Sequence, residues 1–307
     1  MSRGRAWTPD DIPDLTGRRA LVTGVTSGLG EVVVATLARH GAEVVLAARD
    51  EAKLAATVAR IGRDEPGADL RPVLVDLADQ SSVRRGAAEA ATYGPLHLLV
   101  NNAGVMATPY HRTSDGFELQ MATNVLGHFT LTGLLWPRLV ESGDARVVSV
   151  SSQGHRAART APLGDPRVQE GAYRRWPTYA RTKLANLLFT FELDRRARAA
   201  GLPVRPLAEH PGLTATGLMT SGQRAHPGGR ILDAGFALLG QPASMGALPL
   251  LMAATSDLPG STYVGPGGPG EVRGMPQVVG ATKLARDPEA ARRFWEAAQQ
   301  ATGVVYP

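Results

Sequence analysis

The 307-residue chain contains no cysteine. This absence excludes disulfide bonds, and it excludes zinc sites and catalytic nucleophiles that need a thiolate. The chain also lacks any apolar run as long as a membrane span. Its first residues, MSRGRAWTPDD, lack the apolar core of a signal peptide. Together these absences favour a cytoplasmic protein without a membrane span.

A strong charge of one sign is missing as well. Lysine and arginine number 33 and aspartate and glutamate 28, which leaves a net charge of +5. The basic residues are scattered, and no basic stripe alternates with aromatic residues, so we expect no nucleic-acid partner. Histidine is not clustered either. His210 has no second histidine or acid at metal-ligand spacing, so no metal site is predicted.

The most informative pattern in the chain lies between residues 19 and 40. Ala20–Val22 form a short apolar run typical of a buried strand, and apolar residues recur at helical spacing over 33–38. Gly24, Gly28 and Gly30 stand between them. Strand, glycine turn and helix are typical of a dinucleotide site, because glycines let the backbone approach a pyrophosphate and a helix N-terminus binds that anion. The spacing G-x-x-x-G-x-G departs from the generic G-x-G-x-x-G, so an ordinary tight turn is the alternative.

Alternating strand and helix patterns continue along the chain. They predict an α/β fold with a single-domain, Rossmann-type, doubly wound parallel sheet of about seven strands flanked by helices. This one domain covers residues 1–307, with a polar lead-in at 1–17 and a substrate-binding lid at 213–252. The predicted strands lie at 20–22, 43–48, 72–77, 96–100, 146–152, 205–209 and 262–264. Helices are predicted after the glycine turn, at 51–62, 81–93 and 114–139, from 179 onward, and at 245–254 and 287–302. Pro206 predicts a bulge or a short strand.

The end of the second predicted strand indicates which dinucleotide binds. An acid there binds the 2′-hydroxyl of NAD, whereas a nearby arginine suits the 2′-phosphate of NADP. Strand register places Ala48 at the acid position, which favours Arg49 as a phosphate clamp and NADP(H) over NAD(H). A count of about twenty residues from the last glycine reaches Asp50, which is the NAD alternative. In a third interpretation Arg49 merely lies in solvent.

Polar residues end three further predicted strands. Asp76, followed by Leu77, closes the third strand, where it either accepts a hydrogen bond from an adenine amino group or serves as an acid at a helix N-terminus. Asn101–Gly104 leave the fourth strand, and amide side chains there can tie neighbouring strands and line a cofactor groove. Ser151 and Ser152 end the fifth strand.

Two predicted helices carry polar residues of interest. Asn124 lies within helix 114–139, and an asparagine in a helix interior usually has a local hydrogen-bonding reason. Tyr179 and Lys183 are four residues apart, so they share one helix face. A nearby cation favours the phenolate and lowers the tyrosine pKa from its ordinary value of about 10. Considered alone, however, two such residues are more often a surface pair than a catalytic one.

Taken in order, these motifs resemble the short-chain dehydrogenase/reductase family. The resemblance rests on T-G-V-T-S-G-L-G (23–30), N-N-A-G (101–104), Asn124, S-S (151–152), Y-A-R-T-K (179–183) and H-P-G (210–212). The L-A-A-R end of the second strand, the H-P-G and the long gap between Ser152 and Tyr179 are most similar to the retinol-dehydrogenase and protochlorophyllide-reductase-like branch. The opening W-T-P-D-D-I-P-D and the closing R-F-W-E-A-A-Q-Q-A-T-G-V resemble actinobacterial members of that branch.

The resemblance implies hydride transfer between NADP(H) and a carbonyl or alcohol. It implies that Tyr179 donates the proton that hydride addition to a ketone requires, while Lys183 lowers the Tyr179 pKa and hydrogen-bonds the nicotinamide ribose. By the family pattern the second serine, Ser152, orients the substrate oxygen, and Asn124 holds a water that connects Lys183 to solvent. These four residues are the implied catalytic set.

The implied cofactor-binding residues come from the strand ends, the helix with the tyrosine and lysine, and the segment after H-P-G. They are Gly24, Thr26, Ser27, Gly28, Leu29, Gly30, Arg49, Asp76, Leu77, Asn102, Ala103, Gly104, Tyr179, Lys183, Pro211, Gly212, Thr214 and Thr216. The two threonines are candidates to contact the carboxamide or the phosphates. Thr216 fits the family's P-G-x-x-x-T spacing better than Thr214.

The apolar lid, with its methionines and leucines, predicts a lipophilic or aromatic ketone, aldehyde or secondary alcohol as the substrate. C=C reduction, epimerisation and a non-catalytic NADP-binding redox sensor are the alternatives, although a sensor has no need of the Ser–Tyr–Lys set. Family members often associate through the long helices that here carry Asn124 and Tyr179, so a homo-oligomer is an open expectation.

Overall fold

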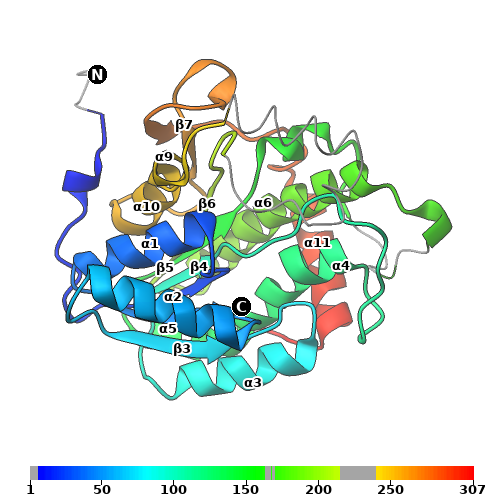
Figure 1. Cartoon of the computed structure of the whole chain (residues 1–307). Helices are drawn as coiled ribbons and strands as arrows, with labels where there is room; N and C mark the ends of the chain where they lie inside the picture. The colour runs from blue at the N-terminus through cyan, green and yellow to red at the C-terminus, as the bar shows by residue number, and fades with distance from the viewer. Residues whose placement is uncertain (1–5, 163–166, 168–169, 215–239) are drawn as a thin grey trace.

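An eight-stranded sheet forms the centre of the computed structural model, which describes residues 6–162, 167, 170–214 and 240–307 (Figure 1). The strand order is β3-β2-β1-β4-β5-β6-β7-β8; β1 to β7 are parallel, and β8 is antiparallel to β7. The strands are β1 (Arg19–Thr23), β2 (Glu43–Ala48), β3 (Leu70–Leu74), β4 (Leu98–Asn101), β5 (Ala145–Val150), β6 (Val204–Glu209), β7 (Tyr263–Pro266) and β8 (Pro276–Val278). The predicted α/β fold is confirmed, with eight strands where about seven were expected.

Helices cover both faces of the sheet (Figure 1). One face carries α1 (Gly28–Arg39), α2 (Glu51–Asp64), α9 (Ala243–Gly246) and α10 (Leu248–Thr255). The other carries α3 (Gln80–Ala91), α4 (Leu119–Met121), α5 (Gly127–Glu141), α6 (Arg175–Ala199) and α11 (Pro288–Thr302). Successive residues of a strand therefore enter opposite cores: Leu21 packs on the α6 side, whereas Ala20 and Val22 pack on the α1 side. This burial explains the unbroken apolar runs.

The strand order reverses between β1 and β4. From β1 the chain adds β2 and then β3 on one side, and it later returns to place β4 against the other side of β1. In such sheets, ligands bind in the crevice outside the carboxyl ends of the strands at this switch point. The glycine turn after β1 and the Asn102–Gly104 segment after β4 both lie there.

Two predicted strands differ from the observed ones. The third strand ends at Leu74 rather than at 77, because it pairs only with β2, whose last residue, Ala48, lies opposite Leu74. The predicted bulge or short strand at Pro206 is wrong, because β6 keeps an unbroken register with β5 over six residues. The Pro206 carbonyl accepts a hydrogen bond from Ser261 N–H, so the missing N–H faces the β7 side before β7 begins.

Helix boundaries also differ from the predicted ones. The helix predicted from residue 114 begins at Leu119, because the Glu118 carboxylate caps it by accepting from Gln120 N–H (2.9 Å) and Met121 N–H (2.8 Å). A π-helical turn, η2 (Ala122–Leu126), then separates α4 from α5. The helix predicted from Tyr179 begins four residues earlier, at Arg175. Short 3-10 turns occur at η1 (Pro9–Asp11), η3 (Gln153–Ala157), η4 (Glu170–Ala172) and η5 (Pro269–Glu271).

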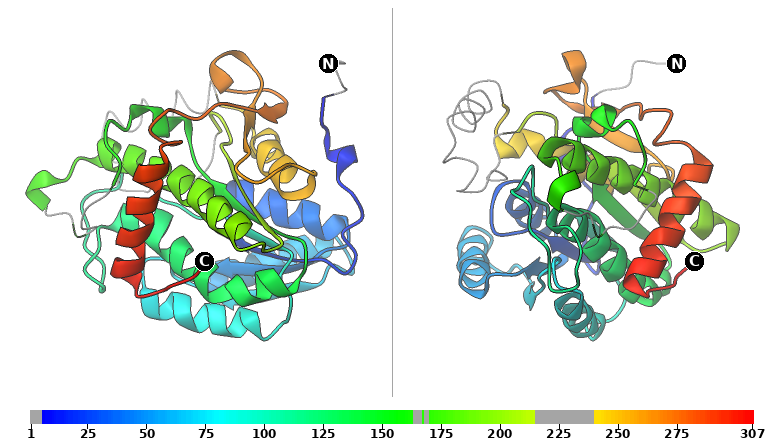
Figure 2. Two further views of the ribbon diagram at one scale, coloured as in Figure 1. Left: turned by 180° about the vertical axis from the view of Figure 1, so that it is seen from behind. Right: turned by 90° about the vertical axis from the view of Figure 1, so that its right-hand side faces the viewer.

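The C-terminal helix lies against α6 (Figure 2). Trp295 of α11 is fully buried and stacks on Phe189 of α6, with ring centres 5.9 Å apart. Phe129 and Tyr306 complete the cluster, with their ring centres 5.0 and 4.8 Å from that of Trp295. The end of the chain thus supports the helix that carries Tyr179 and Lys183.

Candidate active site

The turn between β1 and α1 has no room for side chains at two of its glycines. Gly24 has a φ of +71°, and a Cβ added there would lie 2.7 Å from the Ala103 Cα atom. A Cβ on Gly30 would lie 2.3 Å from the Gly24 carbonyl oxygen. These approaches bring the start of α1 directly onto the ends of β1 and β4. The cradle fits a pyrophosphate, which a helix N-terminus attracts by its dipole and free N–H groups.

Hydrogen bonds tie the ends of β1 and β4 together. The Asn102 side-chain amide donates to the carbonyl oxygens of Thr23 (2.7 Å) and Gly24 (3.2 Å). The Thr23 hydroxyl accepts from the backbone N–H groups of Asn102 and Ala103, both at 3.0 Å. The expectation that an amide after the fourth strand ties neighbouring strands therefore matches the structure, whereas Thr23 was not predicted. Its only sequence signal is a polar residue at the end of a buried strand.

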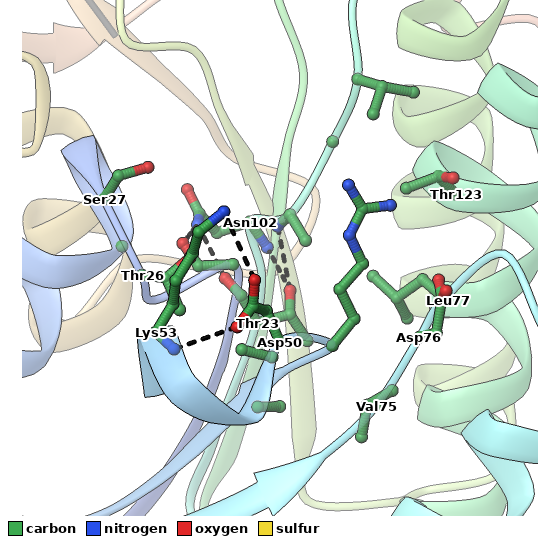
Figure 3. Close-up of a pocket in the computed structure, with 18 of the residues that line it drawn as sticks. Thr23, Thr26, Ser27, Asp50, Lys53, Val75, Asp76, Leu77, Asn102 and Thr123 are labelled. Atoms are coloured by element: carbon green, nitrogen blue, oxygen red, sulfur yellow. Dashed lines mark hydrogen bonds and ion pairs between the residues drawn. The ribbon is translucent and has the colours of Figure 1, made fainter. Parts of the chain in front are cut away.

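A cavity of about 360 Å³ opens beside this junction (Figure 3). The structure brings together on its wall all the residues predicted from the glycine turn and from the ends of the second, third and fourth strands. They are Gly24, Thr26, Ser27, Gly28, Leu29, Gly30, Arg49, Asp76, Leu77, Asn102, Ala103 and Gly104. The wall also contains Lys53, Val105 and Thr123, which sequence reasoning missed.

The three residues near the end of β2 have different surroundings. Asp50 caps α2, accepting from Lys53 N–H at 3.0 Å, and its carboxylate lies 3.4 Å from Lys53 Nζ (Figure 3). The hydrogen bond from Lys53 N–H holds the Asp50 pKa below its usual value. Arg49 is exposed at the cavity rim. All three residues line the cavity, and the acid is already engaged by the helix start.

Asp76 lies in the cavity wall and does not cap a helix. Asp79 caps α3, accepting from Ser81 and Ser82 N–H groups, whereas Asp76 accepts from Ala78 N–H at 2.9 Å in the turn before it. Figure 3 shows Asp76 and Leu77 on the side of the cavity opposite Ser27. Of the two interpretations of Asp76, the structure favours the ligand-facing one.

A second cavity, of about 500 Å³, adjoins the first and shares Leu29, Asn102 and Gly104 with it. Ser152, Tyr179 and Lys183 line it together with Pro211, Gly212 and Thr214. Lys183 is the one charged residue among the described residues of this wall. The groove therefore passes from a polar end at the glycine turn to an apolar end at Tyr179.

Three elements bring Ser152, Tyr179 and Lys183 together. Ser152 follows β5 and caps η3, where its Oγ accepts from Gly154 N–H at 3.0 Å. Ser152 and Tyr179 of α6 lie side by side against Gly154, where an added Cβ would lie 3.4 Å from Ser152 Oγ and 3.2 Å from Tyr179 Cε1. Lys183, one turn further along α6, donates from Nζ to the Val150 carbonyl oxygen at 3.0 Å and lies 5.7 Å from the centre of the Tyr179 ring.

The two serines after β5 differ in their partners. Ser151 Oγ donates to the Lys183 backbone carbonyl at 2.8 Å, so its hydroxyl proton is used in a hydrogen bond to α6. Ser152 Oγ instead accepts from Gly154 N–H, beside the Tyr179 ring. The geometry therefore supports the choice of Ser152 over Ser151.

The ionisable groups of this set are shifted mainly by burial. Burial raises the Tyr179 pKa, and the Ser152 hydrogen bond opposes the rise. Burial lowers the Lys183 pKa to about 8, opposed by the charge of Glu209. The expectation that Lys183 depresses the Tyr179 pKa is not met here, because the Lys183 ammonium binds the Val150 carbonyl and burial dominates.

Asn124 lies in the π-helical turn η2 and is fully buried. Its Oδ1 accepts from Val105 N–H at 2.8 Å, and its Nδ2 donates to Val105 O (2.9 Å) and Thr182 Oγ1 (3.0 Å). The helix-interior asparagine thus has a hydrogen-bonding reason, as predicted, although its side-chain partners come from a loop and from α6. Both amide protons are used, which leaves one lone pair of Oδ1 for a water.

The comparisons with known proteins agree with this geometry. The family model described as short chain dehydrogenase matches residues 18–162. A short-chain dehydrogenase/reductase of Armillaria gallica is 36% identical over 301 residues, which cover 94% of this chain and 92% of that protein. The chain belongs to the short-chain dehydrogenase/reductase family.

Two further relatives refine its place among the short-chain dehydrogenases/reductases. Human retinol dehydrogenase 12 is 40% identical over 206 residues, which are 67% of this chain and 64% of that protein. The chain thus matches less than two thirds of that relative's length. A crystal structure of an uncharacterized protein from Mycobacterium paratuberculosis is 40% identical, with a TM-score of 0.82 over 99% of this chain and 100% of that one. The predicted family and its retinol-dehydrogenase-like branch are confirmed.

Parts of this short-chain dehydrogenase/reductase site were not predicted. Of the lid expected at 213–252, Leu213 and Thr214 line the second cavity, while residues 215–239, with Thr216, lie outside the described residues. Residues 243–252 form α9 and most of α10, which packs on the sheet and does not line the second cavity. Met106, Trp176 and Val272 belong to the apolar wall and were not predicted. They come from three separate loop or helix-start segments, so no local pattern marks them. No described helix is long and apolar enough to cross a bilayer.

Proposed function

We propose that this chain is an NADP(H)-dependent oxidoreductase that interconverts a carbonyl and an alcohol on a lipophilic or aromatic substrate. The observation that carries the proposal is that Tyr179 and Ser152 lie side by side at the apolar end of a groove whose other end is the glycine cradle. A nicotinamide cofactor bound there supplies or accepts the hydride.

The chain's own residues have the following roles in this proposal. The glycine turn and the N-terminus of α1 hold the pyrophosphate. Ser152 donates a hydrogen bond to the substrate oxygen and fixes its position beside Tyr179. The Tyr179 hydroxyl gives its proton to that oxygen as negative charge develops, and takes a proton back in the oxidative direction. Lys183, buried and cationic below about pH 8, would hold the nicotinamide ribose.

The preference for NADP(H) rests on the rim of the first cavity. Arg49 and Lys53 are both in its wall, and the Asp50 carboxylate is already bound by the start of α2. A 2′-phosphate would therefore meet Arg49, with the Lys53–Asp50 ion pair beside it, whereas a ribose 2′-hydroxyl would meet a carboxylate that already accepts from Lys53 N–H.

Titration with NADPH and NADH tests the cofactor assignment. We expect NADPH to bind at least about tenfold more tightly, a difference of about 1.4 kcal/mol, and Arg49→Ala to remove that preference. Arg138→Ala is the matched control, because its side chain pairs with Glu141 on α5 and lines neither cavity. Equal or tighter NADH binding would identify Asp50 as the ribose ligand. Binding of neither dinucleotide would contradict the oxidoreductase proposal itself.

The substrate class follows from the second cavity. The described part of its wall combines Met106, Val150, Trp176 and Val272 with a single charged group, Lys183. Burial of apolar surface favours a lipophilic or aromatic partner there, and an anionic group would meet no arginine among the described residues of this wall. Turnover restricted to small, charged sugars would contradict this assignment. An alcohol as the product of a reductive assay excludes C=C reduction.

A further inference from the structure

The Glu271 carboxylate joins two walls of the second cavity. It lies in η5, in the loop between β7 and β8, and its backbone is left-handed, with a φ of +55°. A side chain in this conformation is strained, and glycine adopts it without strain. Three side chains from two other segments converge on the carboxylate: those of Gln153, Arg156 and His210. We call this group the Glu271 clasp.

One arm of the clasp reaches the segment that follows Ser152. Gln153 Nε2 donates to Glu271 Oε2 at 2.6 Å. Arg156 Nη2 lies 3.0 and 3.1 Å from the two carboxylate oxygens. Both donors belong to η3, whose capping residue is Ser152 itself. Gln153 also lines the second cavity, so this arm holds the wall that carries the substrate-orienting serine.

The other arm reaches the H-P-G segment through His210, which is fully buried. His210 Nδ1 accepts from Gly212 N–H at 3.2 Å, so the ring proton resides on Nε2, which donates to Glu271 Oε2 at 3.1 Å. The ring packs tightly on β7, since a Cβ on Gly265 would lie 2.2 Å from His210 Nε2. The His210 ring therefore links the Glu271 carboxylate to the Gly212 backbone through one hydrogen bond at each ring nitrogen.

The residue after Glu271 completes the connection. The Val272 carbonyl accepts from Leu213 N–H at 2.7 Å, and Val272 and Leu213 both line the second cavity. A Cβ on Gly212 would lie 2.3 Å from that same carbonyl oxygen. The loop with Glu271 is thus locked to the 211–214 segment by backbone contacts and to η3 by side chains.

We propose that Glu271 is a positioning residue that sets the distance between the Ser152 wall and the 211–214 wall of the substrate cavity. This inference rests on the proposed function for its effect on catalysis. Its carboxylate touches neither cavity directly, and it acts through Gln153, Arg156 and His210. Loss of the clasp frees two walls that must hold the substrate oxygen beside Tyr179, and misplacement of about 1 Å can reduce a rate by about a hundredfold.

The test compares Glu271→Gly with Glu271→Gln. Glycine removes the carboxylate but relieves the backbone strain, so the variant separates positioning from folding. We expect Glu271→Gly to lower kcat/KM for nonanal and acetophenone by about ten- to a hundredfold, with the NADPH Kd within about threefold of the parent value. Glu271→Gln keeps one acceptor oxygen for His210 or Gln153 and should recover part of the loss. Glu289→Gln, whose carboxylate pairs with Arg292 on α11, is the matched control.

Amide hydrogen exchange gives a readout that does not depend on turnover. We expect faster exchange in Glu271→Gly at residues 153–157 and 210–214, and unchanged exchange in α11. If Glu271→Gly exchanged its amide hydrogens at the parent's rate in both segments, or faster by the same factor throughout the chain, the proposal that the clasp holds these segments would be wrong. Parental kcat/KM in an active Glu271→Gly enzyme would overturn its role in catalysis. If the parent reduces no carbonyl, the proposed function fails, while the exchange result still decides whether the clasp exists.

Discussion

At the scale of single residues, chemistry depends on which of two adjacent serines faces the tyrosine. Ser151 and Ser152 follow β5 in sequence, and an extended chain sends neighbouring side chains in opposite directions. Ser151 Oγ donates to the Lys183 carbonyl, whereas Ser152 Oγ accepts from Gly154 N–H beside the Tyr179 ring. We therefore expect a structural role for Ser151 and a substrate-facing role for Ser152.

Alanine variants of the two serines should separate these roles. Ser152→Ala is expected to lower kcat by about a hundredfold, because it removes a hydrogen-bond donor from the substrate oxygen. Ser151→Ala should keep kcat within a few-fold but lose about 1 kcal/mol of unfolding free energy, since it removes one buried hydrogen bond. Steady-state kinetics and urea denaturation check both. The opposite pattern would place the substrate oxygen at Ser151.

At the scale of elements, β6 ends in a group that the mechanism does not use. Glu209 is fully buried, and among the described residues neither of its carboxylate oxygens has a hydrogen-bond partner. Burial raises its pKa well above the ordinary value, and the charge of Lys183 opposes the rise. A raised carboxyl pKa means that the folded protein holds the proton more strongly than the unfolded chain. Stability is then greatest below the ordinary pKa of glutamate and falls as the pH rises toward the folded value.

Glu209→Gln should remove this pH dependence. Between pH 5 and 7 we expect the variant to gain about 1–3 kcal/mol of unfolding free energy relative to the parent, because the unfolded parent ionises freely while the folded parent resists. Glu192→Gln on α6 is the control. Burial, which raises the Glu192 pKa, is outweighed by hydrogen bonds from Arg195 and Arg196, so its pKa lies below the ordinary value. The difference in unfolding free energy between Glu192→Gln and the parent should therefore stay constant from pH 5 to 7. A difference that also stays constant for Glu209→Gln would contradict the prediction.

The boundaries of strands and helices show which parts of the fold apolar periodicity predicts. The first two strands and the helix at 287–302 were predicted nearly to the residue, because apolar spacing and caps such as Asp287 are local signals. The π-helical turn at Asn124 and the early start of α6 at Arg175 were not predicted. Both depend on contacts with distant segments: Asn124 bonds Val105 and Thr182, and the Arg175 carbonyl accepts from Gln120.

At the scale of the whole molecule, the C-terminal helix determines how firmly α6 is held. Trp295→Ala should cost about 3–5 kcal/mol of unfolding free energy, since the ring is fully buried among Phe129, Phe189 and Tyr306. Urea denaturation measures the loss. The kcat measured well below the melting temperature should stay within a few-fold of the parent, because Trp295 lines neither cavity. A loss below about 1 kcal/mol would show that α11 is not needed to hold α6.

By itself, the sequence determined the order of strands and helices, the glycine turn, and the sharing of one helix face by Tyr179 and Lys183. Each of these depends on spacing over a few residues, which backbone geometry converts directly into structure. Only the tertiary structure decided that Asp50 caps a helix while Arg49 faces the groove, that Met106, Trp176 and Val272 share one wall, and that Glu271 joins η3 to His210. These relations join residues from separate segments, up to 118 positions apart for Gln153 and Glu271, and no local periodicity specifies such a contact.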